Sequence, residues 1–241
     1  MRYAVVSDIH GNLEALKAVL KDIKKKKISD IPFLGDAVGY GPDPDECVEV
    51  LNSECKILLA GNHDRAVLGL TDIEYFNPYA KAAILWTRET IKKENVSILK
   101  GLPISKAIEG KKIFIVHSTP KEPKQWHYLL TLWDAEINFH YFDSKICLLG
   151  HSHQSFIIER LPSGEMITYR SEAKIGETKR YIINVGSVGQ PRDGDHRACY
   201  AIIDDSSVKL QRVEYDIKKT QDKMRMHGLP LPLIERLERG V

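Results

Sequence analysis

The feature of this sequence that most constrains its fold is a series of short hydrophobic runs that each end in acidic, amide or imidazole side chains. The five runs, with the residues that follow them, read YAVV–SDIH, IPFL–GDAVGYG, KILLA–GNHD, IFIV–HS and ICLL–GHSH. Short apolar runs bounded by polar residues are typical of buried strands. Because the carboxyl ends of strands in an α/β sheet meet along one edge, we expect the polar residues to converge there.

The order of the remaining elements predicts two sheets packed together. Behind the N-cap Asn12, the apolar residues Leu13, Leu16 and Ile23 recur at the spacing of one helical face. Strand and helix patterns alternate at first and strands dominate later, which favours two mixed sheets flanked by helices, an α/β (α+β) class. No linker or repeat interrupts the pattern, so residues 1–241 are expected to form a single domain. Further helices are expected at 78–93, 216–226 and 230–239, and further strands at 156–160, 166–170, 181–184, 198–204 and 208–214.

The charge balance and the distribution of apolar residues exclude several classes of protein. Lys and Arg number 35 and Asp and Glu number 33, a net charge of +2 that offers no basic surplus for non-specific binding of nucleic acid. No segment approaches the roughly 18 apolar residues of a membrane span, and the N-terminus turns polar too early for a signal peptide. The four cysteines lie far apart, without a CxxC pair, as in reduced cytosolic proteins. The sequence therefore predicts a cytoplasmic protein without a membrane partner.

The residue types at the ends of the runs point to metal binding. The i, i+2 pairs Asp8/His10 and His151/His153 can each present both side chains on one side of an extended segment. Oxygen and imidazole donors suit Mn, Fe, Ni or Zn, and no cysteine thiolate is offered. Seven donors are too many for one tetrahedral site and suit two divalent metal ions that share a carboxylate. The seven candidate metal ligands are Asp8, His10, Asp36, Asn62, His117, His151 and His153.

The alternative interpretation is that each of these is an ordinary hydrogen-bonded residue at a strand end. That interpretation would have to hold independently in five places, which makes it the weaker one. The other histidines lack the strand-end context and are expected at the surface or behind the site. They are His127, His140, His196 and His227.

The series DIH, GDAVGYG, GNHD, H and GHSH resembles the calcineurin-like metallophosphoesterase superfamily. The later stretch NVGSVGQPRDGD resembles its bacterial and archaeal branch, which includes small phosphodiesterases and enzymes similar to diadenosine tetraphosphatase. The resemblance spans residues 4 to about 204 and implies a four-layer α-β-β-α sandwich. It also implies three ligand roles. Asp8, His10 and His153 would hold one metal ion, Asn62, His117 and His151 would hold the other, and Asp36 would bridge them.

The remaining polar residues of these stretches are assigned roles around the substrate. His63 is not needed as a ligand, so we expect it to protonate or stabilise the leaving group, with Asp64 orienting its ring. Arg65 and Arg192 are candidates for binding the substrate phosphate, and Arg192 is favoured because the glycine-rich stretch 186–190 could bring backbone N–H groups nearby. The aromatic-rich segment 121–133 is either a lid over the substrate or a core helix.

The function expected from these residues is hydrolysis of a phosphate ester. Two metal ions would bind the phosphoryl oxygens, lower the pKa of a shared water and hold it for in-line attack on phosphorus. A phosphodiesterase or a nucleotide or dinucleoside polyphosphate hydrolase is the leading hypothesis. A Ser/Thr protein phosphatase ranks lower because no long insertion is present to form a peptide groove. A nuclease would need a basic track. A scaffold would be expected to lack ligands that this chain retains.

Overall fold

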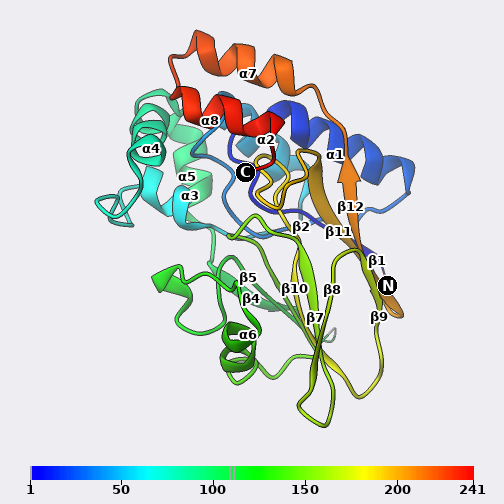
Figure 1. The fold of residues 1–241 in the computed structure, drawn as a ribbon. Coiled ribbons are helices and arrows are strands. Elements are labelled where there is room, and N and C mark those ends of the chain that lie inside the picture. The colour runs from blue at the N-terminus through cyan, green and yellow to red at the C-terminus, as the bar shows by residue number, and fades with distance from the viewer. Residues whose placement is uncertain (1, 109, 111) are drawn as a thin grey trace.

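The computed structural model of the protein describes residues 2–108, 110 and 112–241, and it places two β-sheets face to face between layers of helices (Figure 1). The strands of the first sheet are β1 (Arg2–Val5), β11 (Ala198–Asp204), β12 (Ser207–Val213) and β9 (Glu172–Lys174), in that order. Those of the second sheet are β4 (Ser105–Ile108), β5 (Ile113–Val116), β6 (Ile146–Leu149), β10 (Arg180–Asn184), β7 (Phe156–Arg160) and β8 (Met166–Tyr169), in that order.

A short parallel pair of strands extends the first sheet beyond β1. This pair consists of β2 (Pro32–Phe33) and β3 (Ile57–Leu58). Parallel bridges from Tyr3 to Asp30 and from Val6 to Phe33 attach it to β1. In the second sheet, β5, β6 and β10 run parallel, so their carboxyl ends lie along one edge. The strands that precede the candidate ligands therefore end on the same side of the molecule.

The helices form the two outer layers (Figure 1). Only α6 (Leu132–Asn138) is drawn beside the second sheet, on the far side from the other labelled helices. The helices on the side of the first sheet are α1 (Leu13–Lys25), α2 (Pro44–Glu54), α3 (Asn62–Val67), α4 (Pro78–Thr90), α5 (Lys93–Lys100), α7 (Ile217–Met226) and α8 (Leu231–Glu235).

Three hydrophobic clusters fill the spaces between these layers. Along β1, Ala4 packs with the helices of the first layer, whereas its neighbours Tyr3 and Val5 pack between the two sheets. This alternation follows from the period of two along a strand. A third cluster, which includes Ile182 and Phe139, lies between the second sheet and α6. The expected four-layer α-β-β-α sandwich is thus confirmed.

Several element boundaries differ from those expected. The helix expected at 78–93 ends at Thr90, because Ile91 adopts an extended backbone, and α5 begins two residues later. The helix expected at 230–239 consists of α8 and a 3₁₀ turn, η2 (Arg236–Glu238). The elements α5, α6, β4 and β9 were not predicted. All four are short, and β4 is a partly exposed edge strand without the apolar alternation that identifies a buried one.

Polar contacts, partly or fully buried, bind the C-terminal helix α7 to the body of the protein. Lys223 on α7 donates to Glu14 and to Asp43, both at 2.9 Å, and Thr220 donates to the N-cap residue Asn12 at 3.0 Å. All four cysteines are buried and free, as expected. In the described part of the chain, no helix combines the length and the apolar character that crossing a membrane requires.

Candidate metal centre

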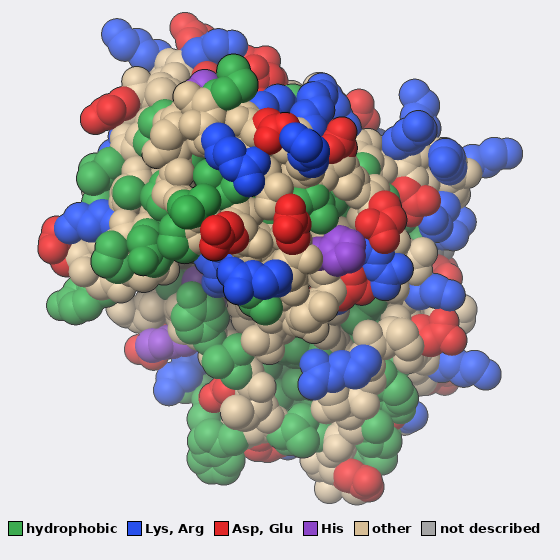
Figure 2. All heavy atoms as spheres, turned by 45° about the horizontal axis from the view of Figure 1, so that its top comes forward, with side chains coloured by type: hydrophobic (Ala, Val, Ile, Leu, Met, Phe, Trp, Pro, Cys, Tyr) green, Lys and Arg blue, Asp and Glu red, His purple; other side chains and the backbone are tan. Residues whose placement is uncertain are grey.

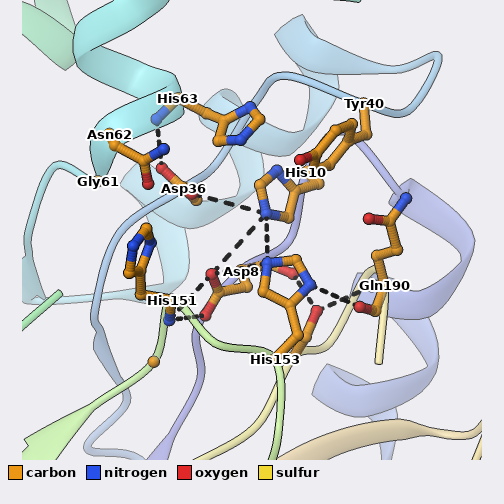
Figure 3. A network of polar contacts seen from close by, with 12 residues as sticks. Asp8, His10, Asp36, Tyr40, Gly61, Asn62, His63, His151, His153 and Gln190 are labelled. Carbon is orange, nitrogen blue, oxygen red and sulfur yellow. Dashed lines mark hydrogen bonds and ion pairs between the residues drawn. The ribbon is translucent and has the colours of Figure 1, made fainter. Parts of the chain in front are cut away.

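The structure brings all seven predicted donor residues together at the carboxyl ends of the strands, and Figure 3 labels all of them except His117. Asp8 and His10 follow β1, Asp36 follows β2, and Asn62 is the first residue of α3. His117 follows β5, and His151 and His153 follow β6. Every one of these side chains is buried.

The backbone at these positions is unusual. Five of the seven residues have a positive φ, between 50° and 65°, in the left-handed region that L-residues seldom occupy. They are Asp8, His10, Asp36, His151 and His153. Non-glycine residues in this region concentrate at functional sites, where the surrounding structure holds the strained conformation. Here the carbonyls of Gly35 and Asp36 accept the amides of Asp8 and His10, each at 2.9 Å.

Glycines leave the room that the carboxylates need. A methyl group on Gly61 would overlap Oδ1 of Asp36, and one on Gly150 would overlap Oδ2 of Asp8. The glycines of GNHD and GHSH therefore allow close approach of the backbone to the two candidate carboxylate ligands. This requirement is the physical reason that glycine precedes the polar residues in both motifs.

The seven predicted donors form two sets, and a further group of ligand atoms, within 4.8 Å of one another, joins His63 to His10 and Asp36. In the first, Nε2 of His153 lies 3.2 Å from Oδ1 of Asp8 and 3.0 Å from Nε2 of His10. In the second, Nε2 of His117 lies 3.2 Å from Oδ1 of Asn62 and 3.3 Å from Oδ2 of Asp36, and His151 belongs to the same group. Oδ2 of Asp36 also lies 3.6 Å from Nε2 of His10, so Asp36 stands between the two sets.

The hydrogen bonds of the histidine rings determine which nitrogen faces the centre. Nδ1 of His10, His117 and His153 contacts the carbonyl of Val38, Leu34 and Gln190 respectively, at 3.1, 3.0 and 2.6 Å. A carbonyl can only accept, so each Nδ1 carries the proton, and Nε2 of a neutral ring presents a lone pair. His151 is reversed, because its Nε2 donates to the carbonyl of Trp126 at 2.8 Å and its Nδ1 is free to bind.

The pKa shifts indicate that the cluster contains neutral imidazoles and ionised carboxylates, both of which can act as acceptors. Burial lowers the pKa of His153 to about 3 and that of His151 to about 4, so both rings are neutral. Burial also lowers the pKa of His117, but the Asp36 carboxylate outweighs it and raises that pKa to about 9. Burial raises the pKa of Asp8 and Asp36, yet the surrounding imidazoles hold both well below their usual range.

A cation fits this arrangement. The centre holds two buried carboxylates and several inward-facing lone pairs, and Oδ2 of Asp36 accepts no hydrogen bond from the described residues. Nε2 of neutral His153 faces Nε2 of His10 at 3.0 Å, a contact that two lone pairs cannot make favourably. Divalent metal ions that prefer oxygen and imidazole donors would satisfy all of these atoms. The donor set therefore fits the metal that the sequence motifs imply.

His63 lies beside the cluster with its ring packed among aromatic groups. Its backbone N–H donates to Oδ1 of Asp36 at 2.8 Å. Its ring centroid lies 4.7 Å from that of His10, 4.4 Å from that of Tyr40 and 5.2 Å from that of Phe76. Nδ1 is buried and has no hydrogen-bond partner among the described residues, and burial lowers the pKa of the ring well below its ordinary value. His63 is thus a neutral imidazole with hydrogen-bonding capacity to spare.

The prediction that Asp64 orients the His63 ring is wrong. The Asp64 carboxylate instead accepts backbone N–H groups of Gly61 and of the loop after β2, at 2.8 to 3.3 Å. Those loop amides belong to residues 36–38, which include Asp36 itself. A buried carboxylate needs several donors, and these amides supply them. Asp64 thereby joins the start of α3 to the loop that carries Asp36.

The two candidate arginines have different surroundings. Arg192 donates to the Tyr40 hydroxyl at 3.2 Å and lies 5.5 Å over the Tyr40 ring, which in turn contacts His10 and His63. Its Nε is buried without a hydrogen-bond partner in the described structure. Arg65 is half-buried, and its side chain makes no hydrogen bond or ion pair with any described residue and does not line the cleft beside the cluster.

The glycine-rich stretch 186–190 does not offer free amides, contrary to expectation. The amides of Val188 and Gly189 donate to the carbonyls of Ser7 and Asp8, and that of Gln190 donates to the Ser187 hydroxyl. The stretch therefore supports the loop after β1 and does not form a phosphate-binding nest. Its contribution to the cluster is the Gln190 carbonyl that holds His153.

The segment 121–133 is not a core helix. A 3₁₀ turn, η1 (Pro123–Gln125), leads to a stretch without regular secondary structure, and α6 begins only at Leu132. The Tyr128 ring stacks on His151 with centroids 4.3 Å apart, and the Trp126 ring lies 6.0 Å from that of His117. The segment thus lies against the second donor set. Sequence analysis missed the Trp126 carbonyl, because a backbone acceptor leaves no side-chain signal.

The four other histidines lie outside the cluster, as expected. Three are exposed and pair with glutamates, and the fourth contacts Trp86 at 5.2 Å between ring centroids. They are His127, His140, His196 and His227. Figure 2 shows Lys and Arg side chains interspersed with Asp and Glu over the face it displays, without a continuous basic track.

Residues 1–155 match the sequence model of the calcineurin-like phosphoesterase family. The chain belongs to this family. It is an enzyme of the metallophosphoesterase class, whose members hydrolyse phosphoester bonds with the help of metal ions.

Known relatives of this metallophosphoesterase extend over its whole length. An uncharacterized protein of Methanocaldococcus jannaschii is 46% identical over 241 residues, which cover 98% of this chain and 97% of that protein. The crystal structure of a metallophosphoesterase from Sphaerobacter thermophilus is similar with a TM-score of 0.88 and 41% identity, over 100% of this chain and 99% of that one. A structure described as a candidate diadenosine tetraphosphatase shares the fold at 18% identity, with a TM-score of 0.54 over 88% and 94% of the two chains.

Proposed function

We propose that this metallophosphoesterase is a phosphodiesterase or a nucleotide or dinucleoside polyphosphate hydrolase that works with two divalent metal ions. The observation that carries the proposal is the position of Asp36. Its Oδ2 lies 3.6 Å from Nε2 of His10 and 3.3 Å from Nε2 of His117, between the two donor sets. A carboxylate shared in this way is what two adjacent ions require.

The ligands are assigned from the two sets. Asp8, His10 and His153 would hold one ion. Asn62, His117 and His151 would hold the other, with Asp36 shared. Divalent ions held there would bind the phosphoryl oxygens and lower the pKa of a shared water for in-line attack on phosphorus. Mn, Fe, Ni and Zn all accept this donor set.

The chain's own residues act around this centre. His63, neutral and beside Asp36, would donate a hydrogen bond to the leaving-group oxygen and stabilise its developing charge. Arg192, whose guanidinium Tyr40 and Gln190 hold at 3.2 and 2.9 Å, would supply positive charge near the bound phosphate. Trp126 and Gln190 hold His151 and His153 in the tautomers that can bind metal.

The cellular setting is part of the same proposal. We assign the enzyme to the cytoplasm, on the basis of its free buried cysteines. We also propose that residues 1–241 fold as one domain, because β11 and β12 lie in the same sheet as β1 and α7 is bound to Glu14 of α1.

Hydrolysis of chromogenic esters tests the proposal. The protein, stripped of metal and then supplied with Mn²⁺, is expected to hydrolyse bis(p-nitrophenyl) phosphate faster than p-nitrophenyl phosphate and to lose activity with a chelator. Preference for the monoester would favour a protein-phosphatase type of enzyme. Absence of hydrolysis with Mn²⁺, Fe²⁺, Ni²⁺ and Zn²⁺ would overturn the proposal and favour a scaffold.

A further inference from the structure

A cleft opens beside the metal centre, on the side of Asn62, His63 and His151. Its volume is about 740 Å³, which is within the range of pockets that enclose a small-molecule ligand. One wall is the connection between α3 and α4, and the other is the segment that follows η1. Figure 1 shows these two segments, in cyan and green, on the same side of the molecule. A phosphate held at the centre would therefore direct one of its substituents into this cleft.

The apolar lining of the cleft is aromatic. Only Leu70 and Ala80 contribute aliphatic side chains. Flat rings present π-faces on which planar groups such as bases stack. A planar ring is therefore a substituent that such walls would bind well. The aromatic residues are Tyr75 and Phe76 on the first wall, Trp126 and Tyr128 on the second, and Tyr40 from the loop after β2.

Polar side chains also contribute to the same lining. A nucleobase is a planar group that combines a stacking face with a hydrogen-bonding edge. A plain aryl group can stack but has no donors or acceptors to pair with the polar residues. We infer that the cleft binds the nucleoside part of a phosphoester whose phosphate sits at the metal centre. This inference rests on the proposed function, because the centre anchors the phosphate. The polar lining residues are Thr71, Asp72, Asn77, Lys124 and Gln125.

Tyr75 is the residue on which the inference can be tested without disturbing the fold. Its side chain is 93% exposed, although it is a large aromatic group, and it makes no hydrogen bond or ring contact with any described residue. Nothing within the described structure accounts for its position at the edge of the cleft. Tyr79 is a matched control, because it is a 48% exposed tyrosine four residues away that does not line the cleft.

The experiment compares two competitive inhibitors of bis(p-nitrophenyl) phosphate hydrolysis that carry the same phosphate. Adenosine 5′-monophosphate has a base, and ribose 5-phosphate does not. We expect the wild-type protein to bind the nucleotide at least about fivefold more tightly, as one base stacked on aromatic rings would provide. Tyr75→Ala should reduce this ratio severalfold and leave the inhibition constant of ribose 5-phosphate unchanged. Tyr75→Phe should preserve the ratio, and so should the control Tyr79→Ala.

Equal inhibition by the two compounds in the wild-type protein would overturn the inference, and so would a ratio that Tyr75→Ala leaves intact. Either result leaves the proposed function standing, because diester hydrolysis is measured in the same assay. If the protein hydrolyses no ester, the proposed function fails, and calorimetric titration of the Mn²⁺-loaded protein with the same two compounds still decides whether the cleft prefers a base.

Discussion

The imidazoles of His10 and His153 face each other through Nε2 atoms that lie 3.0 Å apart, while Nδ1 of each ring is occupied by a backbone carbonyl. Two neutral rings fixed in this way repel each other unless a proton or a metal ion lies near both. The contact joins residues 143 positions apart in the sequence. A metal ion near the two rings would bind both lone pairs, so we expect a bound cation to stabilise the centre.

Removal of metal should lower the thermal stability of the protein. A ligand present at about a hundred times its Kd stabilises a fold by about 2.7 kcal/mol, which corresponds to about 5–10 °C in a protein of this size. Scanning calorimetry of metal-loaded and chelator-treated samples measures the difference. Addition of Mn²⁺ should restore the Tm. A Tm that does not change when metal is removed would contradict a cation-dependent centre.

Asp36→Asn should abolish metal binding and activity together. The substitution removes a buried negative charge from the point between the two donor sets, where Oδ2 approaches both His10 and His117. Elemental analysis and diester hydrolysis are the measurements. Asp222→Asn, which changes an exposed carboxylate on α7, is the control for the loss of one charge. Full metal content in the Asp36 variant would remove this residue from the ligand set.

His63→Ala should keep the metal and lose catalysis. The ring contacts His10 and Tyr40 but approaches no donor through a hydrogen bond, so its removal leaves the two sets intact. Loss of a hydrogen bond that stabilises the leaving group should lower kcat by about 10²–10³. Steady-state kinetics and metal analysis of the same sample separate the two effects. A variant that purifies without metal would instead make His63 part of the binding site.

Asp64→Asn should destabilise the fold, because its carboxylate accepts four backbone N–H groups. An amide nitrogen placed against those donors should cost about 1–3 kcal/mol of unfolding free energy. Urea denaturation of metal-free protein measures this cost without interference from the ions. If stability were unchanged while kcat fell as in His63→Ala, a role in orienting His63 would have to be restored.

The stability of metal-free protein should fall between pH 6.5 and pH 9. Burial alone would lower the pKa of His117. The Asp36 carboxylate outweighs burial and raises this pKa to about 9 in the folded state. A raised folded-state pKa adds stability below the unfolded value of about 6.5, and this contribution disappears as the pH rises through 9. Urea denaturation across this range measures the slope. Metal-loaded protein should lack this loss, because a cation replaces the proton.

The candidate ligands could be predicted because each follows an apolar strand, and the parallel strands β5, β6 and β10 bring their ends to one edge. The role of Asp64 could not, because three of its four partners are backbone amides 26 to 28 positions earlier, whose direction depends on the loop after β2. The contact between the Trp126 carbonyl and His151 could not be predicted either, because this carbonyl is also a backbone group. The amides of 188–190 were misjudged because the sequence does not reveal that the loop after β1 uses them. The short elements α5 and β4 have too few buried residues to produce a periodic pattern.

The left-handed main chain at five of the seven donor positions limits how this centre could be re-engineered. Asn, Asp and His are the side-chain-bearing residues that tolerate this conformation best. A substitution such as His153→Cys or His151→Glu, made to attract a softer or harder ion, would place at a left-handed position a residue that tolerates this conformation less well. The variant would therefore be strained before any ion binds. The choice of metal in this enzyme is thus restricted by torsion angles as well as by coordination chemistry.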